Sequence, residues 1–252
     1  MAGHSKWSKV KRIKGALDAK RGMLFSKLSK EIIVAARAGG GNPEANHRLR
    51  AAIQSARAQS MPNENIERAI KKGTGESGAA ALEELLYEGY APGGVAVMVE
   101  AATDNKNRTA AELRSIFSKN GGSLAGPGSV AYLFHRKGQI TLPVEACKED
   151  RLFEIAVNAG ADEIETDESH HLILTPPDRL AAVADALRGA GLTPDSQKLT
   201  FVNSTTVRPA DSASARQALR LLEALEECDD VLHVHANLEI EDELLASHQP
   251  IS

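Results

Sequence analysis

The order of periodic segments in the middle of the chain constrains its fold more than any other feature. Residues 132–203 read as strand, helix, strand, strand, helix, strand, with β-branched runs alternating with amphipathic stretches. This order matches a ferredoxin-like split βαβ unit, so the segment predicts a complete small α+β domain. The expected strands are Tyr132–Phe134, Gln139–Leu142, Glu163–Thr166, His171–Leu174 and Lys198–Val202, and the expected helices are Glu149–Asn158 and Asp178–Arg188.

The segments on either side of this unit must then pair with each other. Residues 81–131 and 204–245 both contain strand and helix patterns, so we expect them to form a second, discontinuous α+β domain of ferredoxin-like type. The patterns are a β-branched run at Val95–Val99, a helix at Arg108–Lys119, a helix near Ser212–Glu227 and a strand at Val231–His235. Two polar segments, EGYAPGG at 88–94 and DNKNRT at 104–109, are interpreted as turns.

A different periodicity, that of helices, fills the N-terminal part of the chain. Apolar residues recur at helical spacing in 18–38 and 44–60, and Asn63–Lys72 has a capping residue at its start and lysines at its end. The small and glycine-rich segment 73–80 then reads as a linker. We therefore predict an N-terminal helical bundle domain over residues 1–75. Its first 17 or so residues form a basic arm that precedes the helices.

Charge is segregated along the chain, although the net charge is only -4. Residues 1–72 carry 16 Lys and Arg against 5 Asp and Glu, whereas residues 73–252 carry 14 against 29. Such asymmetry favours a polyanionic partner, because Lys and Arg side chains displace the counterions condensed on a nucleic acid. The alternative interpretation is a solvated charged face, which is common in proteins of any function.

The candidate nucleic-acid-binding residues are the cations of this N-terminal part together with Trp7, whose ring could stack on an exposed base. They are Lys6, Trp7, Lys9, Lys11, Arg12, Lys14, Lys20, Arg21, Lys27, Lys30, Arg37, Arg48, Arg50 and Arg57. Lys106 and Arg108 form a possible second surface. Lys71 and Lys72 are weaker candidates, because basic residues in a last helical turn also offset the helix dipole.

Motifs for catalysis, cofactors or metals are weak. Residues 73–78 satisfy GxGxxG but follow a helix, whereas a dinucleotide site requires that motif between a strand and a helix. A metal site of His233 and His235 with Asp229 and Asp230 can be imagined, but a histidine pair on a sheet surface is the favoured interpretation, because isolated histidine pairs seldom bring the third ligand and second shell that a metal requires. We predict no catalytic residues, no metal, no cofactor and no small-molecule substrate, and hence no enzyme.

The composition predicts a soluble cytoplasmic protein. Cys147 and Cys228 are far apart and form no CxxC pair, which fits a reducing compartment. No apolar run approaches the roughly 18 residues that span a bilayer, and the N-terminus lacks the apolar stretch of a secretory signal. We expect no membrane partner.

Several ordered motifs resemble the YebC family of transcriptional regulatory proteins. The motifs are AGHSKW at 2–7, DAKRG at 18–22, AARAGGGNP at 35–43, RLRAAI at 48–53, YEGYAPGG at 87–94, DNKNRT at 104–109, GSVAYLF at 128–134 and CDDV at 228–231. The resemblance extends over nearly the whole chain. It implies three domains, a bacterial cytoplasmic location and DNA binding as a transcriptional regulator.

The resemblance also leaves a second role open. Mitochondrial relatives of this family are translational activators, and bacterial members are connected with ribosomes translating proline-rich stretches, so ribosomal RNA is an alternative partner. Phosphate contacts carry no sequence information and occur with both polymers, so the charge pattern does not separate the two. Alternatives of another class are an electrostatic scaffold and an unrecognised enzyme.

Overall fold

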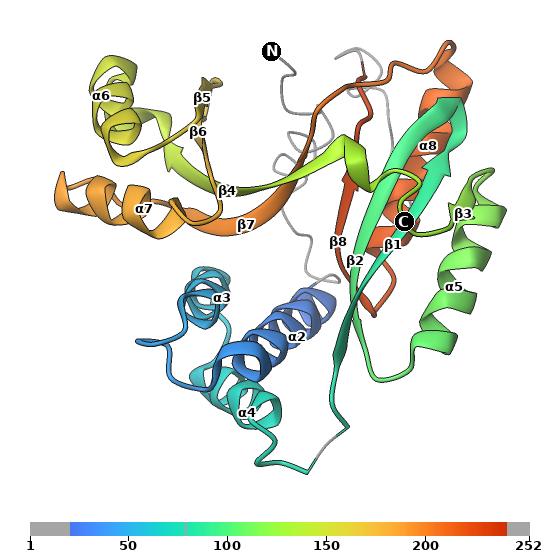
Figure 1. Cartoon of the computed structure of the whole chain (residues 1–252), viewed down its shortest axis with the longest axis horizontal. Helices are drawn as coiled ribbons and strands as arrows, with labels where there is room; N and C mark the ends of the chain where they lie inside the picture. Colours follow the sequence, from blue (N-terminus) through green and yellow to red (C-terminus); the bar gives the residue numbers. More distant parts are fainter. Residues whose placement is uncertain (1–20, 79, 241–252) are drawn as a thin grey trace.

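The computed structural model describes residues 21–78 and 80–240 of the 252-residue chain. Within these ranges the chain forms a group of three helices and two four-stranded antiparallel sheets (Figure 1). Each sheet carries two helices of its own on one face, so the predicted class, α+β with an N-terminal helical part, is confirmed.

The three N-terminal helices are α2 (Arg21–Gly39), α3 (His47–Ala58) and α4 (Asn63–Gly73). Asn46 fixes the corner between α2 and α3. Its side-chain oxygen accepts a hydrogen bond from the Leu49 backbone N–H at 3.0 Å and caps α3, while its amide donates to the Ala35 carbonyl at 2.7 Å. The helices enclose a core of small and aliphatic side chains, among them Ile32 and Leu49.

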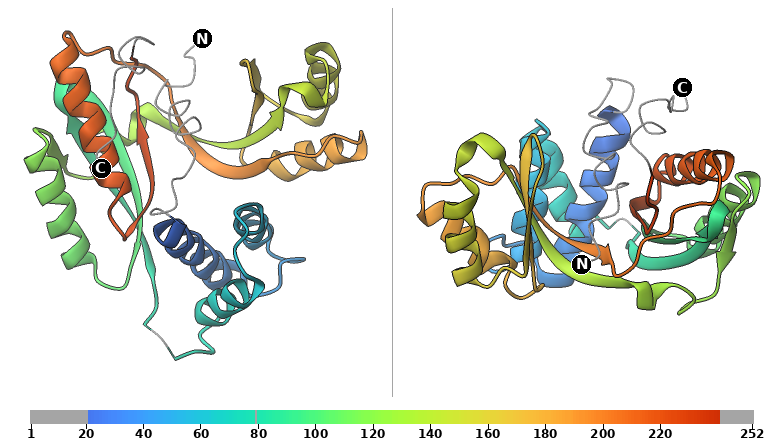
Figure 2. Two further views of the ribbon diagram at one scale, coloured as in Figure 1. Left: turned by 180° about the vertical axis from the view of Figure 1, so that it is seen from behind. Right: turned by 90° about the horizontal axis from the view of Figure 1, so that it is seen from above.

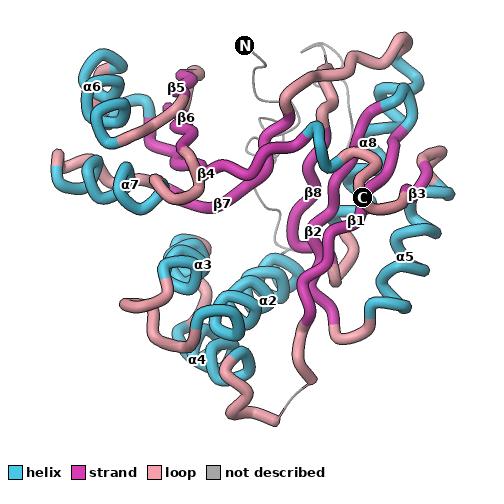
Figure 3. Tube along the Cα trace, viewed as in Figure 1, coloured by secondary structure: helices cyan, strands magenta, loops and turns pink. Residues whose placement is uncertain are grey.

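The outer sheet has the strand order β3-β1-β2-β8. Its elements are β1 (Glu83–Ala91), β2 (Val95–Thr103), α5 (Lys106–Lys119), β3 (Ser123–Ala125), α8 (Ser212–Glu226) and β8 (Val231–Ala236). The β-branched run that predicted a strand forms β2, and α5 and α8 pack on one face of the sheet (Figure 3). Its two central strands, β1 and β2, are joined directly as a hairpin.

The predicted turn at 88–94 is too long. Strand β1 continues to Ala91, and only Pro92, Gly93 and Gly94 form the turn, with Gly93 at φ +80° and Gly94 at φ +75°. The polar Glu88 remains in the strand because its carboxylate is buried and accepts backbone N–H groups from the segment 128–131.

The second sheet has the order β5-β6-β4-β7, which is the ferredoxin-like order predicted for 132–203. Its elements are β4 (Phe134–Pro143), α6 (Glu149–Ala159), β5 (Glu163–Thr166), β6 (His170–Thr175), α7 (Leu180–Gly189) and β7 (Ser196–Asn203). The helices cover one face over a core that includes Ile140, Leu152 and Leu187.

The two strands expected at the start of this unit form one. Strand β4 runs from Phe134 to Pro143 without a break, because Gly138 pairs with Thr175 on one side and Leu199 on the other. Tyr132 is not in a strand and lies in a short 3-10 turn, whose first residue, Ala131, donates its backbone N–H to Glu88.

The chain thus forms three units: the N-terminal helices, the outer sheet with its two helices, and the second sheet with its two helices. They meet at the face of the outer sheet that carries no helix (Figure 2). Ala102 and Leu232 of that sheet belong to the core of the three helices, whereas Met98 packs with Val130 and Phe134 at the entry to the second sheet. The boundaries predicted near residues 75, 131 and 203 stay a prediction.

Gly138→Ala is expected to destabilise the unit built on the second sheet. A Cβ at this position would lie 2.3 Å from the Thr175 hydroxyl and 2.8 Å from Leu180 Cβ, so the core must shift. We expect a loss of about 2 kcal/mol in the free energy of unfolding, measured by urea titration. Gly189→Ala is the matched control, since its Cβ meets nothing within 4 Å. Equal stability of the two variants would contradict the prediction.

Candidate nucleic-acid interface

The structure tests only part of the predicted interface. Lys6, Trp7, Lys9, Lys11, Arg12, Lys14 and Lys20 lie outside the described residues, and Arg21 is described only as the first residue of α2. Their role stays a prediction. The remaining candidates lie on α2, on α3 and in the first turn of α5, where their contacts are defined.

The candidate cations of α2 contact the outer sheet and its helix. Lys27 donates its ammonium to the Glu226 carbonyl, at the end of α8. Lys30, one turn further on, donates to the Asp229 carbonyl at 2.7 Å and to the Asp230 carboxylate at 2.8 Å. Arg37 donates to the Leu82 carbonyl at 2.7 Å. The basic face of α2 therefore holds the helix against the neighbouring unit.

The candidates of α3 divide into two kinds. Arg48 forms a two-pronged ion pair with Glu84 of β1, and Arg50 donates to the carbonyls of Pro43 and Glu44. The Arg57 side chain is exposed and makes no hydrogen bond or ion pair in the described ranges. Among the described candidates of α2 and α3, Arg57 is thus the one whose charge has no partner within the described chain.

Asp230 is the hub of these contacts. Besides Lys30, its buried carboxylate accepts hydrogen bonds from the Thr109 hydroxyl at 2.7 Å and the Arg108 guanidinium at 3.0 Å. Burial alone would raise the pKa of this carboxyl, but the hydrogen bonds from Lys30, Thr109 and Arg108 hold it well below its usual range. Asp230 stays negative and joins α2 to α5 and β8.

The possible second surface is also engaged internally. The Lys106 ammonium lies 3.3 Å from the Glu83 carboxylate, and Arg108 is paired with Asp104 as well as Asp230. Both side chains are more than half exposed, so a phosphate would have to compete with these carboxylates. A role for Lys106 and Arg108 in nucleic-acid binding stays a prediction.

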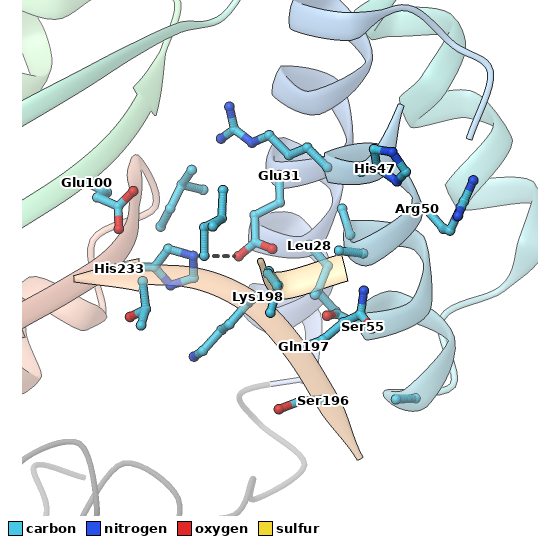
Figure 4. A pocket seen from close by; sticks show the side chains of 18 of the residues that line it. Leu28, Glu31, His47, Arg50, Ser55, Glu100, Ser196, Gln197, Lys198 and His233 are labelled. Atoms are coloured by element: carbon cyan, nitrogen blue, oxygen red, sulfur yellow. Dashed lines mark ion pairs between the residues drawn. The ribbon is translucent and has the colours of Figure 1, made fainter. Parts of the chain in front are cut away.

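A cavity of about 830 Å³ lies where the three units meet. Its walls come from α2 and α3, from β2 and β8 of the outer sheet, and from β7 and α7. Figure 4 shows side chains of α2, α3, β2, β7 and β8. Glu31 and His233 are in contact where they line it, with His233 Nε2 lying 3.1 Å from Glu31 Oε1. In the same region His235 Nε2 lies 2.6 Å from Glu100 Oε1.

Both carboxylates keep their charge. For Glu31 and Glu100 burial is the largest influence and raises the pKa, but the neighbouring histidines outweigh it. Arg136 adds to this effect at Glu100, whose pKa falls from 4.5 to about 2, and Lys198 does the same at Glu31. The cavity region thus contains carboxylate–histidine pairs contributed by several elements.

The imagined metal site is not assembled. His233 and His235 contact Glu31 and Glu100, while Asp230 is bound by Lys30 and Arg108. Within residues 21–78 and 80–240, no group of three or more His, Cys, Asp or Glu side chains is arranged to hold a metal ion.

Two other motifs are placed by the structure. The glycine-rich segment 73–78 follows α4 and leads toward β1, so it does not have the strand-to-helix setting of a dinucleotide site. Cys147 and Cys228 are free thiols. Among the described residues, no helix is both long and apolar enough to cross a bilayer.

The fold and its three-part arrangement are those of a known family. The model of the TACO1/YebC protein N-terminal domain matches residues 5–76, and the model of the TACO1/YebC second and third domain matches residues 82–238. The chain belongs to the TACO1/YebC family, as its motifs predicted.

Close relatives span the whole chain. A protein of Rubrobacter xylanophilus is 54% identical over 98% of both chains, and one of Aquifex aeolicus is 51% identical over 97% of this chain and 98% of its own. Both are named probable transcriptional regulatory protein. The crystal structure of the conserved hypothetical protein Aq1575 from Aquifex aeolicus has a TM-score of 0.84, 50% identity, and covers 91% of this chain and 94% of its own.

Asp230→Asn is expected to loosen the contact between α2 and the outer sheet. The substitution keeps the shape but removes the charge that Lys30 and Arg108 share, and loss of the largely buried pair with Lys30 costs about 3 kcal/mol. Thermal unfolding and hydrogen exchange of α2 measure the effect. The matched control is Asp229→Asn, since that neighbouring side chain is exposed. An equally small effect of both variants would show that Asp230 is not the hub.

The ionised carboxylate of Glu100 makes the free energy of unfolding depend on pH in the acidic range. Its native pKa, about 2, lies below that of an unfolded glutamate, so its contribution is complete above about pH 5 and is lost as the pH falls toward 2. Glu100→Gln is expected to remove on the order of 2 kcal/mol of this acid-sensitive stability. Urea unfolding between pH 3 and 7 tests it, with the exposed Glu112→Gln as control. If Glu100→Gln retains the wild-type pH profile, the prediction is wrong.

Proposed function

We propose that this protein is a DNA-binding regulator of transcription that grips the phosphate backbone through its N-terminal basic residues. The observation that carries the proposal is the segregation of charge, with 16 Lys and Arg against 5 Asp and Glu in residues 1–72 of an otherwise acidic chain. Relatives that match over nearly their full length are named probable transcriptional regulatory protein, which supports the same role.

The contacts of the described cations refine which residues bind DNA. Lys27, Lys30, Arg37 and Arg48 hydrogen-bond or pair with the outer sheet and its connections, so their main role is to orient the basic unit. DNA phosphates are then bound mainly by Lys6, Lys9, Lys11, Arg12, Lys14 and Lys20, with Arg57 adding a further charge. Trp7 stacks where a base is exposed, as in distorted DNA or RNA.

A binding role also accounts for the cavity better than catalysis does. The carboxylates that line it already have partners, Glu31 in His233 and Glu100 in the nearby His235, whereas a catalytic acid or base needs a pKa tuned toward neutrality. Both glutamate pKa values are instead lowered. We place the protein in the cytoplasm, where a bacterial chromosome is accessible to it.

Replacing Lys9, Lys11, Arg12 and Lys14 together with Ala tests the proposal. Each phosphate contact contributes about 0.9 to the slope of log K against log salt, so the variant should bind duplexes of any sequence more weakly and with a flatter slope. Fluorescence anisotropy of labelled DNA between 50 and 300 mM salt measures both quantities.

The matched control removes four exposed cations of α5 and α8, Arg114, Lys119, Arg216 and Arg220, and is expected to keep the wild-type slope. Ribosomal RNA is titrated in parallel. An unchanged slope in the arm variant, or a wild-type protein that binds ribosomal RNA and ignores DNA, would overturn the proposed function.

A further inference from the structure

The outward half of α4 carries three cations that the described chain does not use. The side chains of Arg68, Lys71 and Lys72 are exposed and make no hydrogen bond or ion pair within the described ranges. The helix buries Ile66 and Ala69 on its opposite side. This contrasts with α2, where Lys27, Lys30 and Arg37 all contact the outer unit.

These three cations form no ion pairs within α4 that would account for them. Glu64 and Glu67 stand four residues before Arg68 and Lys71, the spacing at which helical ion pairs form, yet neither pair is within 4 Å. Lys71 and Lys72 do lie in the last turn, where the helix dipole favours cations. That effect requires no particular direction of the side chains, so all three remain available to a ligand.

The end of α4 is held rigidly. Gly73 lies so close to α2 that a Cβ there would be 2.4 Å from the Ile33 carbonyl oxygen and 2.7 Å from Ala36 Cβ. Gly41, which follows α2, packs in the same way against Thr74 and Ile70. The backbone bearing the three cations therefore has a fixed position relative to the core of the N-terminal unit.

The location of α4 leaves room for a long partner. Figures 1 and 2 show it at the end of the molecule remote from α6 and α8, packed on α2 with its other side open. Arg68 and Lys72 are separated by about 6 Å along the helix axis. A DNA duplex carries one negative charge per about 1.7 Å of its axis, so several phosphates lie within reach of this short row.

We propose that the outward face of α4, formed by Arg68, Lys71 and Lys72, is a second phosphate-contact surface for duplex DNA. The inference rests on the proposed function and locates part of it in the described structure. Because the contacts reach phosphates, this surface adds affinity and orientation and does not select a sequence.

The test is the triple variant R68A/K71A/K72A in the full-length protein. Alanine favours the helical conformation, so α4 is retained, and circular dichroism verifies this. We expect the slope of log K against log salt to become smaller in magnitude by about 2 to 3, similarly for duplexes of unrelated sequence. The conservative variant R68K/K71R/K72R keeps the charges and should keep the slope.

The matched control is R114A/K119A/R216A, which removes three exposed cations from α5 and α8 and changes the net charge equally. A loss confined to the α4 variant supports the inference. It is overturned by an unchanged slope in the α4 variant, or by an equal loss in the control, which would indicate a non-local effect of net charge. Wild-type protein without salt-dependent affinity for DNA would instead refute the proposed function itself.

Discussion

The arrangement of this molecule depends on the buried carboxylate of Asp230. A carboxylate removed from water is stable only when charges and donors surround it, and here they come from separate elements: Lys30 from α2, Arg108 and Thr109 from α5. The basic helical unit is thereby oriented against an acidic partner within the same chain. An exposed ion pair between Arg48 and Glu84 adds a second contact between the helical unit and the outer sheet.

This use of charge divides the N-terminal cations into two groups with different tasks. Those on α2 and at the start of α3 contact carbonyls and carboxylates, whereas Arg57 and the cations of α4 remain in solvent. A nucleic acid would have to displace carboxylates to reach the first group and only water to reach the second. The charge asymmetry of the sequence is therefore larger than the charge offered to a partner.

Sequence reasoning predicted the elements well where periodicity was sustained and less well at polar or glycine-containing positions. The ferredoxin-like order of 132–203 followed from alternating patterns, but the sequence predicts separate strands at 132–134 and 139–142, whereas Gly138 pairs on both sides within one continuous β4. Glu88 was placed in a turn because its partners, the backbone N–H groups of 128–131, are about 40 residues away. No local pattern reveals such a contact.

The same limit applied to the candidate site. The sequence gives the positions of the basic residues along the chain but not their partners. That Lys30 binds Asp230 and Arg37 binds the Leu82 carbonyl depends on tertiary structure. Lys71 and Lys72 were discounted on a local argument about the helix dipole, and Arg68 was not singled out. Their exposure beside a rigidly packed Gly73 became visible only in three dimensions.

The strands β4 and β7 have a mechanical consequence. They leave the outer unit side by side, paired from Phe134 with Asn203 to Thr141 with Ser196, and carry α6 and α7 at their far end (Figure 1). Between Phe134 and Lys137 this ribbon has only two strands, because β6 pairs with β4 from Gly138 onward, and a two-stranded ribbon bends and twists more readily than a four-stranded sheet. Flexing near its base would swing the distal helices as a lever and change the width of the central cavity while both sheets stay intact.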